Sequence, residues 1–283
     1  MALDTHFAGV KDLDVSEWGT FYDIGNFENV LRNEPEAKAS VEGIVEFARA
    51  RLGFEPDEKQ AEVLRSRARR GILNCTRQWG KSTTAAVMAV HRALSEEGSV
   101  VLVASPSARQ SAELVEKARG MLAALRITAH GDGHNDVSLA LPNRSRIIGL
   151  PENPATTRGF SAVSLMLIDE AAQVEDGTYK MLRPMLAVSD GDLWLMSTPF
   201  GKRGFFYECW EHGGDEWTRF CVKATGCPRI PPGFLEEERR EMGAAWFGQE
   251  YMAEFIDNGE AVFGRDVVEA ALDDKVKPLW KGR

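Results

Sequence analysis

One short loop carries residue types suited to holding a polyphosphate. Gly80, Lys81 and Ser82 end the run Cys75-Thr76-Arg77-Gln78-Trp79-Gly80-Lys81-Ser82. A phosphate-binding loop aims backbone N–H groups at the phosphates, brings a lysine to the outer phosphates and offers a hydroxyl to magnesium. The usual pattern has a glycine five residues before the Gly-Lys pair, where this chain has Cys75. The alternative to a nucleotide site is a chance tripeptide at a helix start.

Two acids at the end of an apolar run form a second candidate element. Asp169 and Glu170 follow the strand-like run Ser164-Leu165-Met166-Leu167-Ile168. Such a strand places both carboxylates at the carboxyl edge of a parallel sheet, beside the phosphate loop. We expect Asp169 to hold magnesium with Ser82, and Glu170 to act as the catalytic base on the attacking water. The alternative is a helix N-terminus, where acids complement the helix dipole.

An amide and an aromatic ring upstream of the loop are candidates for base recognition. Gln60 can donate to and accept from one edge of adenine, and Phe54 can stack on its face. We therefore expect ATP rather than GTP, although an ordinary helix start with a surface glutamine is the alternative. The predicted nucleotide-binding residues are Phe54, Gln60, Thr76, Arg77, Gln78, Trp79, Gly80, Lys81, Ser82 and Thr83.

Two arginines and two hydroxyls are candidates for sensing the transferred phosphate. Arg77 lies inside the loop, and Arg158 precedes the acidic pair in Thr157-Arg158-Gly159-Phe160. Either guanidinium could stabilise charge on the phosphoryl group, or could instead pair with a surface acid. Ser197 and Thr198 close the next apolar run and could couple loss of the γ-phosphate to the segment that follows. A capped turn is the alternative for these hydroxyls.

Alternating strand and helix patterns surround these residues. Apolar runs predict strands at 71–75, 99–104, 163–168 and 193–196, with an edge pair at 137–141 and 146–150. Helical spacing predicts helices at 41–52, 56–69, 82–94, 108–125 and 179–186. This order favours a mostly parallel sheet covered on both faces. The expected fold class is α/β, a three-layer P-loop NTPase of the ASCE type with a small C-terminal lid subdomain.

Changes in texture along the chain predict four parts. Scattered aromatic residues without a clear period predict an N-terminal arm and helix at 1–50. The predicted P-loop ATPase core covers 51–204. Aromatic and acidic residues, punctuated by glycine and proline pairs, predict the lid subdomain at 205–258. The remaining 259–283 is predicted to be a linker and tail.

Composition places the chain among soluble globular proteins. Of 283 residues, 43% are hydrophobic and 27% are charged, and no apolar run approaches the roughly 18 residues of a membrane span. The start lacks the pattern of a secretory signal, so we expect a cytosolic protein with no membrane partner. A net charge of −9 disfavours bulk coating of nucleic acid but allows local contacts. The four cysteines form no C-x-x-C pair and are predicted to be free thiols.

Taken in order, these motifs resemble the ATPase half of the large terminase subunit of tailed bacteriophages and related prophages, the motor that pumps DNA into a procapsid. The resemblance runs from about Phe54 to Phe263. It rests on the loop and the acidic pair already described, together with Phe54-x-Pro56 and Gln60, Ala104-Ser105-Pro106-Ser107 and Gln110, Arg158-Gly159, Ser197-Thr198-Pro199, and Gln249-Glu250-Tyr251 with Glu254-Phe255. In that family an arginine replaces loop glycines, so the resemblance leads us to expect a loop that lacks the usual glycine at Cys75.

The resemblance implies ATP and Mg²⁺ as cofactors and assigns the site as above, with Ser197-Thr198 as the coupling element. It leaves two routes for the arginine: Arg77 within its own subunit, or Arg158 reaching the nucleotide of a neighbour. The implied partners are double-stranded DNA, a homo-oligomeric ring (a pentamer) on the procapsid portal, and the small terminase subunit, in the cytoplasm of an infected or lysogenic bacterial cell. The family continues into an RNase H-like nuclease where this chain ends at Arg283, so we expect no DNA cleavage from it.

Two other functions fit part of the pattern. A helicase-type DNA-dependent ATPase fragment shares the adenine glutamine, the loop and the acidic pair, but it needs a second motor domain with its own arginines. A nucleotide-binding protein without turnover would release phosphate at the same rate before and after substitution of Glu170. The sequence keeps all four residues expected to carry out hydrolysis, which favours hydrolysis over binding without turnover. These residues are Lys81, Ser82, Asp169 and Glu170.

Overall fold

The computed structural model describes residues 43–135, 137–150, 160–257 and 271. Three predicted features therefore lie outside the described residues: the N-terminal arm up to residue 42, Arg158, and the tail at 259–283 apart from residue 271. No helix within the described ranges combines the length and the apolar character needed to cross a membrane. The four cysteines are free thiols, as predicted.

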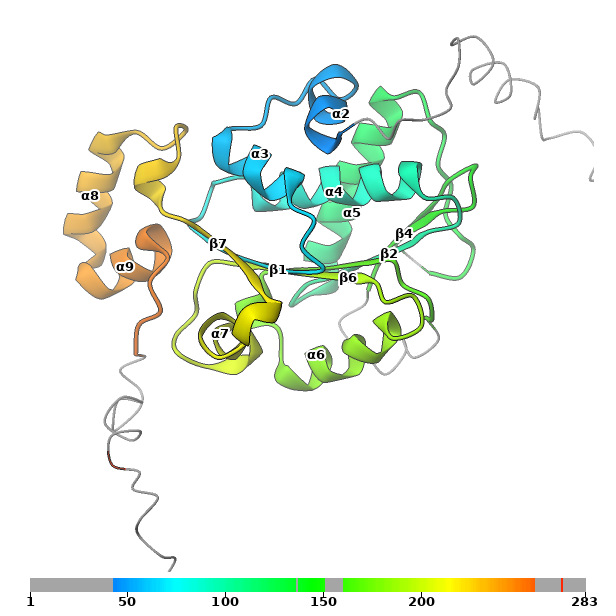
Figure 1. Cartoon of the computed structure of the whole chain (residues 1–283). Coiled ribbons are helices and arrows are strands. Elements are labelled where there is room, and N and C mark those ends of the chain that lie inside the picture. Colours follow the sequence, from blue (N-terminus) through cyan, green and yellow to red (C-terminus); the bar gives the residue numbers. More distant parts are fainter. Residues whose placement is uncertain (1–42, 136, 151–159, 258–270, 272–283) are drawn as a thin grey trace, which may run out of the picture. The chain divides into compact units, whose positions relative to one another are not determined.

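A seven-stranded sheet forms the middle layer of the structure (Figure 1), with strand order β3-β4-β2-β5-β6-β1-β7. The strands are β1 Arg70–Cys75, β2 Val100–Ala104, β3 Ser138–Ala140, β4 Arg146–Gly149, β5 Leu165–Asp169, β6 Asp192–Ser197 and β7 Thr218–Val222. All neighbouring pairs are parallel except β3 with β4, which form the predicted antiparallel edge pair. The strand β6 lies between β1, which precedes the loop, and β5, which ends in Asp169.

Helices cover both faces of this sheet (Figure 1). One face carries α2 Ile44–Ala50, α3 Glu58–Arg65, α4 Lys81–Ser95 and α5 Ala108–Ala124. The other carries α6 Asp176–Leu182, α7 Gly204–Glu211 and the 3₁₀ turns η3 Ala171–Gln173 and η4 Arg183–Leu186. Alternate strand residues face opposite layers, so Leu73 packs with α4 and Ile72 with the layer of α6. The predicted three-layer α/β fold is confirmed.

The strand β7 extends the sheet beyond residue 204. Its pattern did not predict a strand, because only Phe220 and Val222 of its five residues are buried. It pairs with β1, and Phe205 and Phe206 of α7 pack on the second face of the sheet. The sheet and its covering layers thus reach into the segment predicted as a lid, 205–258. The division of the chain into four parts remains a prediction.

Two helices after β7 form a small unit with its own core. These are α8 Pro232–Met242 and α9 Ala244–Met252, which follow the short turns η5 Gly214–Glu216 and η6 Ala224–Gly226. Leu235, Phe247 and Tyr251 pack together with Ala224. We call residues 232–252 the α8–α9 unit.

The close packing of β1 against β6 predicts a difference between two glycines. A Cβ added at Gly71 would lie 2.4 Å from the ring of Trp194, whereas a Cβ at Gly120 in α5 would meet nothing within 4 Å. We expect Gly71→Ala to lower the free energy of unfolding by roughly 1–3 kcal/mol through overpacking. Gly120→Ala should raise it by roughly 0.5–1 kcal/mol because it favours the helix. Urea unfolding measures both, and equal midpoints for the two variants would contradict this packing.

Candidate active site

The loop between β1 and α4 has the backbone form of a phosphate-binding loop. Gln78 and Gly80 adopt φ of 60° and 100°, the left-handed region that favours glycine. A Cβ at Gly80 would also lie 2.9 Å from Nε2 of Gln60, so this amide would have to shift to admit a side chain there. The helix α4 begins at Lys81, and its first backbone bonds are those of Thr83 N and Thr84 N to Gly80 O, so the N–H groups of Lys81 and Ser82 precede the first bond of the helix. The loop therefore presents amide donors at a helix N-terminus.

Cys75, at the place of the usual first glycine, is the last residue of β1. It is fully buried, and burial raises the pKa of its thiol to about 12, so the thiol is neutral at physiological pH. The loop turns only after it, where Thr76 N donates to Val222 O at 2.9 Å. Since the first positive φ in the loop comes at Gln78, position 75 needs no glycine.

The loop lysine, Lys81, reaches the carboxyl ends of β5 and β6. Lys81 Nζ donates to Thr198 Oγ1 at 3.1 Å and lies 3.5 Å from Oε1 of Glu170. Ser197 Oγ donates to the other oxygen of Glu170 at 3.4 Å. Glu170 itself has φ of 50°, an unusual backbone state for a residue with a side chain and one that clusters at functional sites. Four of the predicted site residues therefore meet at one sheet edge.

The other acid contacts the loop hydroxyl. Asp169 is buried, its Oδ2 accepts from Ser82 Oγ at 2.9 Å, and its Oδ1 accepts from Glu170 N at 3.1 Å. Burial, together with the negative charge of Glu170, raises the pKa of Asp169 above its ordinary value. A divalent cation would offset this excess of negative charge, and a carboxylate with a hydroxyl is the oxygen-donor set that Mg²⁺ takes.

The donors available for a metal ion are few. Within the described part of the chain, no three His, Cys, Asp or Glu side chains lie close enough together to hold a metal ion. Mg²⁺ commonly completes its shell with waters and substrate phosphates. Asp169 and Ser82 therefore fit a magnesium ion that arrives with a nucleotide.

The predicted adenine-reading amide lies beside the loop. Gln60 Oε1 accepts from Asp57 N at 3.0 Å, and Nε2 donates to Trp79 O at 3.1 Å. The side chain is buried, and Trp79 is fully buried. Phe54 packs partly buried against the same core cluster. The structure brings Gln60 to the loop, and its contact with adenine stays a prediction.

The loop arginine is held by the second helix of the α8–α9 unit. Arg77 Nε forms an ion pair with Oε2 of Glu250, and Arg77 N donates to Glu250 O at 3.3 Å. Thr76 Oγ1 donates to the same carbonyl at 3.1 Å. The guanidinium thus contacts α9 rather than Asp169 or Glu170. Arg158 lies outside the described residues, so the choice between the two arginines stays open.

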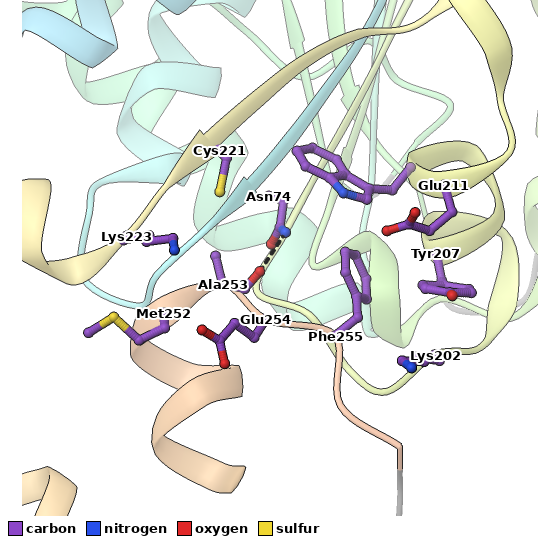
Figure 2. Close-up of a pocket in the computed structure, with 11 residues that line it drawn as sticks. Asn74, Lys202, Tyr207, Glu211, Cys221, Lys223, Met252, Ala253, Glu254 and Phe255 are labelled. Atoms are coloured by element: carbon purple, nitrogen blue, oxygen red, sulfur yellow. Dashed lines mark hydrogen bonds between the residues drawn. The ribbon is translucent and has the colours of Figure 1, made fainter. Parts of the chain in front are cut away.

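The end of α9 is also tied to β1 and to the loop after β6. Gln249 Oε1 accepts from Gly201 N at 3.1 Å. Asn74 Nδ2, at the end of β1, donates to Ala253 O at 2.8 Å, and Figure 2 shows this bond in the wall of a pocket between α7, β7 and the end of α9. None of the predicted nucleotide-binding residues lines that pocket.

Sequence reasoning assigned no role to three residues that touch the site. Gln249 and Glu250 belong to a motif of the resemblance, which is a signal that could have pointed to them. Arg229 carries no motif, yet its Nη2 donates to Trp79 O and, at 2.9 Å, to Oδ2 of Asp57. It lies in the segment that joins β7 to α8.

The chain is similar to the large terminase subunits of bacteriophages in both sequence and structure. A family described as the terminase large subunit, T4likevirus-type, N-terminal, matches residues 72–269. The terminase large subunit of Thermus virus P23-45 is 27% identical over 252 residues, which cover 75% of this chain and 51% of that protein. The chain therefore spans about half the length of the curated relatives it matches.

Solved structures share the fold at lower identity. The large terminase ATPase domain of Thermus phage P74-26 superposes with a TM-score of 0.65 at 22% identity, covering 74% of this chain and 97% of that one. The large terminase of a thermophilic bacteriophage in complex with ADP gives a TM-score of 0.61 at 11% identity, covering 70% of this chain and 53% of that one. Both likenesses support the P-loop fold.

The electrostatics of the site predict opposite effects for two aspartates. Because the pKa of Asp169 is raised by folding, its ionised form lowers stability at pH 7, and this cost disappears as the pH falls through the folded pKa. We expect Asp169→Asn to raise the urea midpoint in magnesium-free buffer at pH 7.

Asp132, in the loop before β3, is the matched control. Burial opposes its charge, but hydrogen bonds from His134 N, Asn135 and Ser138 lower its pKa to about 2. The ionised form therefore adds stability above the unfolded pKa, and this is lost as the pH falls through about 2. Asp132→Asn should lower the midpoint at pH 7. A lowered midpoint for Asp169→Asn would show that its charge is not a cost to the fold.

Proposed function

We propose, from the premise that this chain belongs to the terminase large-subunit family, that it is an ATP-hydrolysing motor domain that drives double-stranded DNA into a procapsid. The observation that carries the proposal is the meeting of Lys81 and Ser82, at the start of α4, with Glu170 and Asp169, at the end of β5. The sheet edge thus combines a phosphate-binding loop with a candidate metal ligand and a candidate base.

We assign each side chain a step in hydrolysis. The loop amides and Lys81 hold the β- and γ-phosphates, which fixes the phosphorus for in-line attack. Mg²⁺, held by Ser82, Asp169 and the phosphates, would neutralise charge on the phosphoryl oxygens. Glu170 accepts the proton of the attacking water, and the hydrogen bond from Ser197 orients its carboxylate.

The strand β6 offers a route from the nucleotide to the α8–α9 unit. Thr198 contacts Lys81, and Ser197 contacts Glu170, so both hydroxyls lie next to groups whose partners change on hydrolysis. The loop that follows β6 reaches Gln249 of α9 through Gly201 N. We propose that loss of the γ-phosphate shifts this loop, and that α9 moves with it.

The identity of the nucleotide and of the partners belongs to the same proposal. ATP is favoured by Gln60 beside the loop and by the ADP complex of the related large terminase, and Mg²⁺ is favoured by the contact of Ser82 with Asp169. The family membership favours double-stranded DNA, a homo-oligomeric ring on the portal and the small terminase subunit as partners. The site of action would be the cytoplasm of the bacterial host.

Substitution of the base separates turnover from binding. We expect Glu170→Gln to lower the rate of phosphate release by roughly 10²–10⁴-fold, since general-base catalysis is worth about that much. ATP should still bind, because Lys81 and the loop amides remain. Glu116→Gln, which changes an exposed carboxylate on α5, is the control and should keep the wild-type rate. Equal release rates for wild type and Glu170→Gln would support a nucleotide-binding protein without turnover.

Mixing of variants distinguishes the two arginines. If Arg158 acts on the nucleotide of a neighbour, Arg158→Ala subunits mixed with Glu170→Gln subunits should regain activity, because some sites then carry both intact groups. If Arg77 acts in its own subunit, Arg158→Ala subunits should already turn over ATP on their own, mixing should give no more than the activity of those subunits, and Arg77→Ala alone should abolish turnover. Phosphate release measured across a series of mixing ratios decides between them.

A further inference from the structure

One carbonyl in the phosphate loop accepts hydrogen bonds from two distant side chains. Trp79 O accepts from Gln60 Nε2 at 3.1 Å and from Nη2 of Arg229. The peptide between Trp79 and Gly80 is planar and trans, so its C=O and N–H point in opposite directions. Because Gln60 and Arg229 hold the carbonyl on their side of the loop, Gly80 N–H points to the opposite side, where it is available to a bound phosphate.

The same two side chains are also joined to each other through Asp57. Arg229 Nη2 donates to Asp57 Oδ2 at 2.9 Å, while Asp57 Oδ1 accepts from Gln60 N at 2.8 Å. Gln60 Oε1 in turn accepts from Asp57 N, which completes the capping box at the start of α3. Trp79 O, Gln60, Asp57 and Arg229 thus form a closed hydrogen-bond network, and the guanidinium of Arg229 is the only positive charge in it.

The chain on both sides of Arg229 is packed into the core, which holds this arginine next to the loop. Its neighbours Cys227 and Ile230 pack in the core cluster that also contains Trp79. Its side chain is 45% exposed, so an isolated ion pair with Asp57 would add little stability. Within the described ranges, Asp57 and Trp79 are its only hydrogen-bond partners. Because the ion pair with Asp57 adds little stability, we base the role of Arg229 on its hydrogen bond to the carbonyl of Trp79.

The loop needs such a restraint because of Gly80. A glycine populates positive and negative φ about equally, so the Trp79–Gly80 peptide is free to rotate unless neighbouring groups hold it. A hydrogen bond from a guanidinium is stronger than one from a neutral amide. Arg229 therefore supplies a restraint that Gln60 alone provides more weakly.

We propose that Arg229 is a positioning residue that holds the Trp79–Gly80 peptide in its phosphate-binding orientation and so sets the affinity for the phosphate groups of the nucleotide. This inference rests on the proposed function of the loop. It assigns Arg229 no contact with the base. Its loss should weaken binding of any polyphosphate that occupies the loop, with or without adenosine.

Two ligands and two substitutions test the inference. KM and kcat for ATP, and the inhibition constant of inorganic tripolyphosphate, are measured for wild type, Arg229→Gln and Arg229→Lys. Arg119→Gln, which changes an exposed arginine on α5, is the matched control. We expect Arg229→Gln to raise KM and the inhibition constant by the same factor, about tenfold, as loss of one charged hydrogen bond would. kcat should fall much less, and Arg229→Lys should recover part of the loss.

A cycle with Asp57 shows whether the effect travels through the network. Asp57→Asn keeps a good capping residue at the start of α3 but removes the charge that holds Arg229. We expect the double variant Asp57→Asn/Arg229→Gln to bind tripolyphosphate no more weakly than Arg229→Gln alone. The melting temperature of each variant is measured to show that the fold persists.

Two results would overturn the inference while leaving the proposed function intact. One is an unchanged inhibition constant for tripolyphosphate in an Arg229→Gln variant that is folded, when the wild-type protein hydrolyses ATP. The other is an Asp57→Asn substitution that weakens tripolyphosphate binding as much in the Arg229→Gln background as in the wild type. A wild-type protein that binds neither ATP nor tripolyphosphate would instead overturn the proposed function, and this inference with it.

Discussion

The parallel pairing of β1, β6 and β5 is the constraint on which the site depends. In parallel strands the carboxyl ends lie at one edge, and the register here sets Asn74 opposite Ser197 and Asp169 opposite Met196. The loops that leave these three strands therefore begin side by side. Only with this alignment can the first turn of α4 contact both Asp169, the last residue of β5, and Glu170, which follows it.

A second set of contacts holds the loop from outside. Gln60 and Arg229 bind one of its carbonyls, and Glu250 binds the side chain and backbone N–H of Arg77 and the hydroxyl of Thr76. These groups come from α3, the segment before α8, and α9. The inner face of the loop is left to the acids and to its own amides. The phosphate loop is thus held by the sheet edge on one side, and on the other by α3, α9 and the segment before α8.

The sequence predicted which residues meet at the sheet edge better than it predicted the contacts around them. Lys81, Ser82 and Asp169 each lie next to an apolar strand whose pattern is visible, so their meeting follows from the parallel sheet alone. The contact of Arg229 with Trp79 joins residues 150 apart, and that of Arg77 with Glu250 joins residues 173 apart. No local pattern encodes them. The strand β7 was missed because an edge strand with exposed residues lacks an apolar run.

We propose that the loop and the acidic pair together hydrolyse ATP for DNA movement. Phosphate release from ATP by the purified protein, measured with and without Mg²⁺ and with and without double-stranded DNA, tests this proposal. We expect release that requires Mg²⁺ and increases when duplex DNA is added. Release no faster than the uncatalysed background under all four conditions would contradict it.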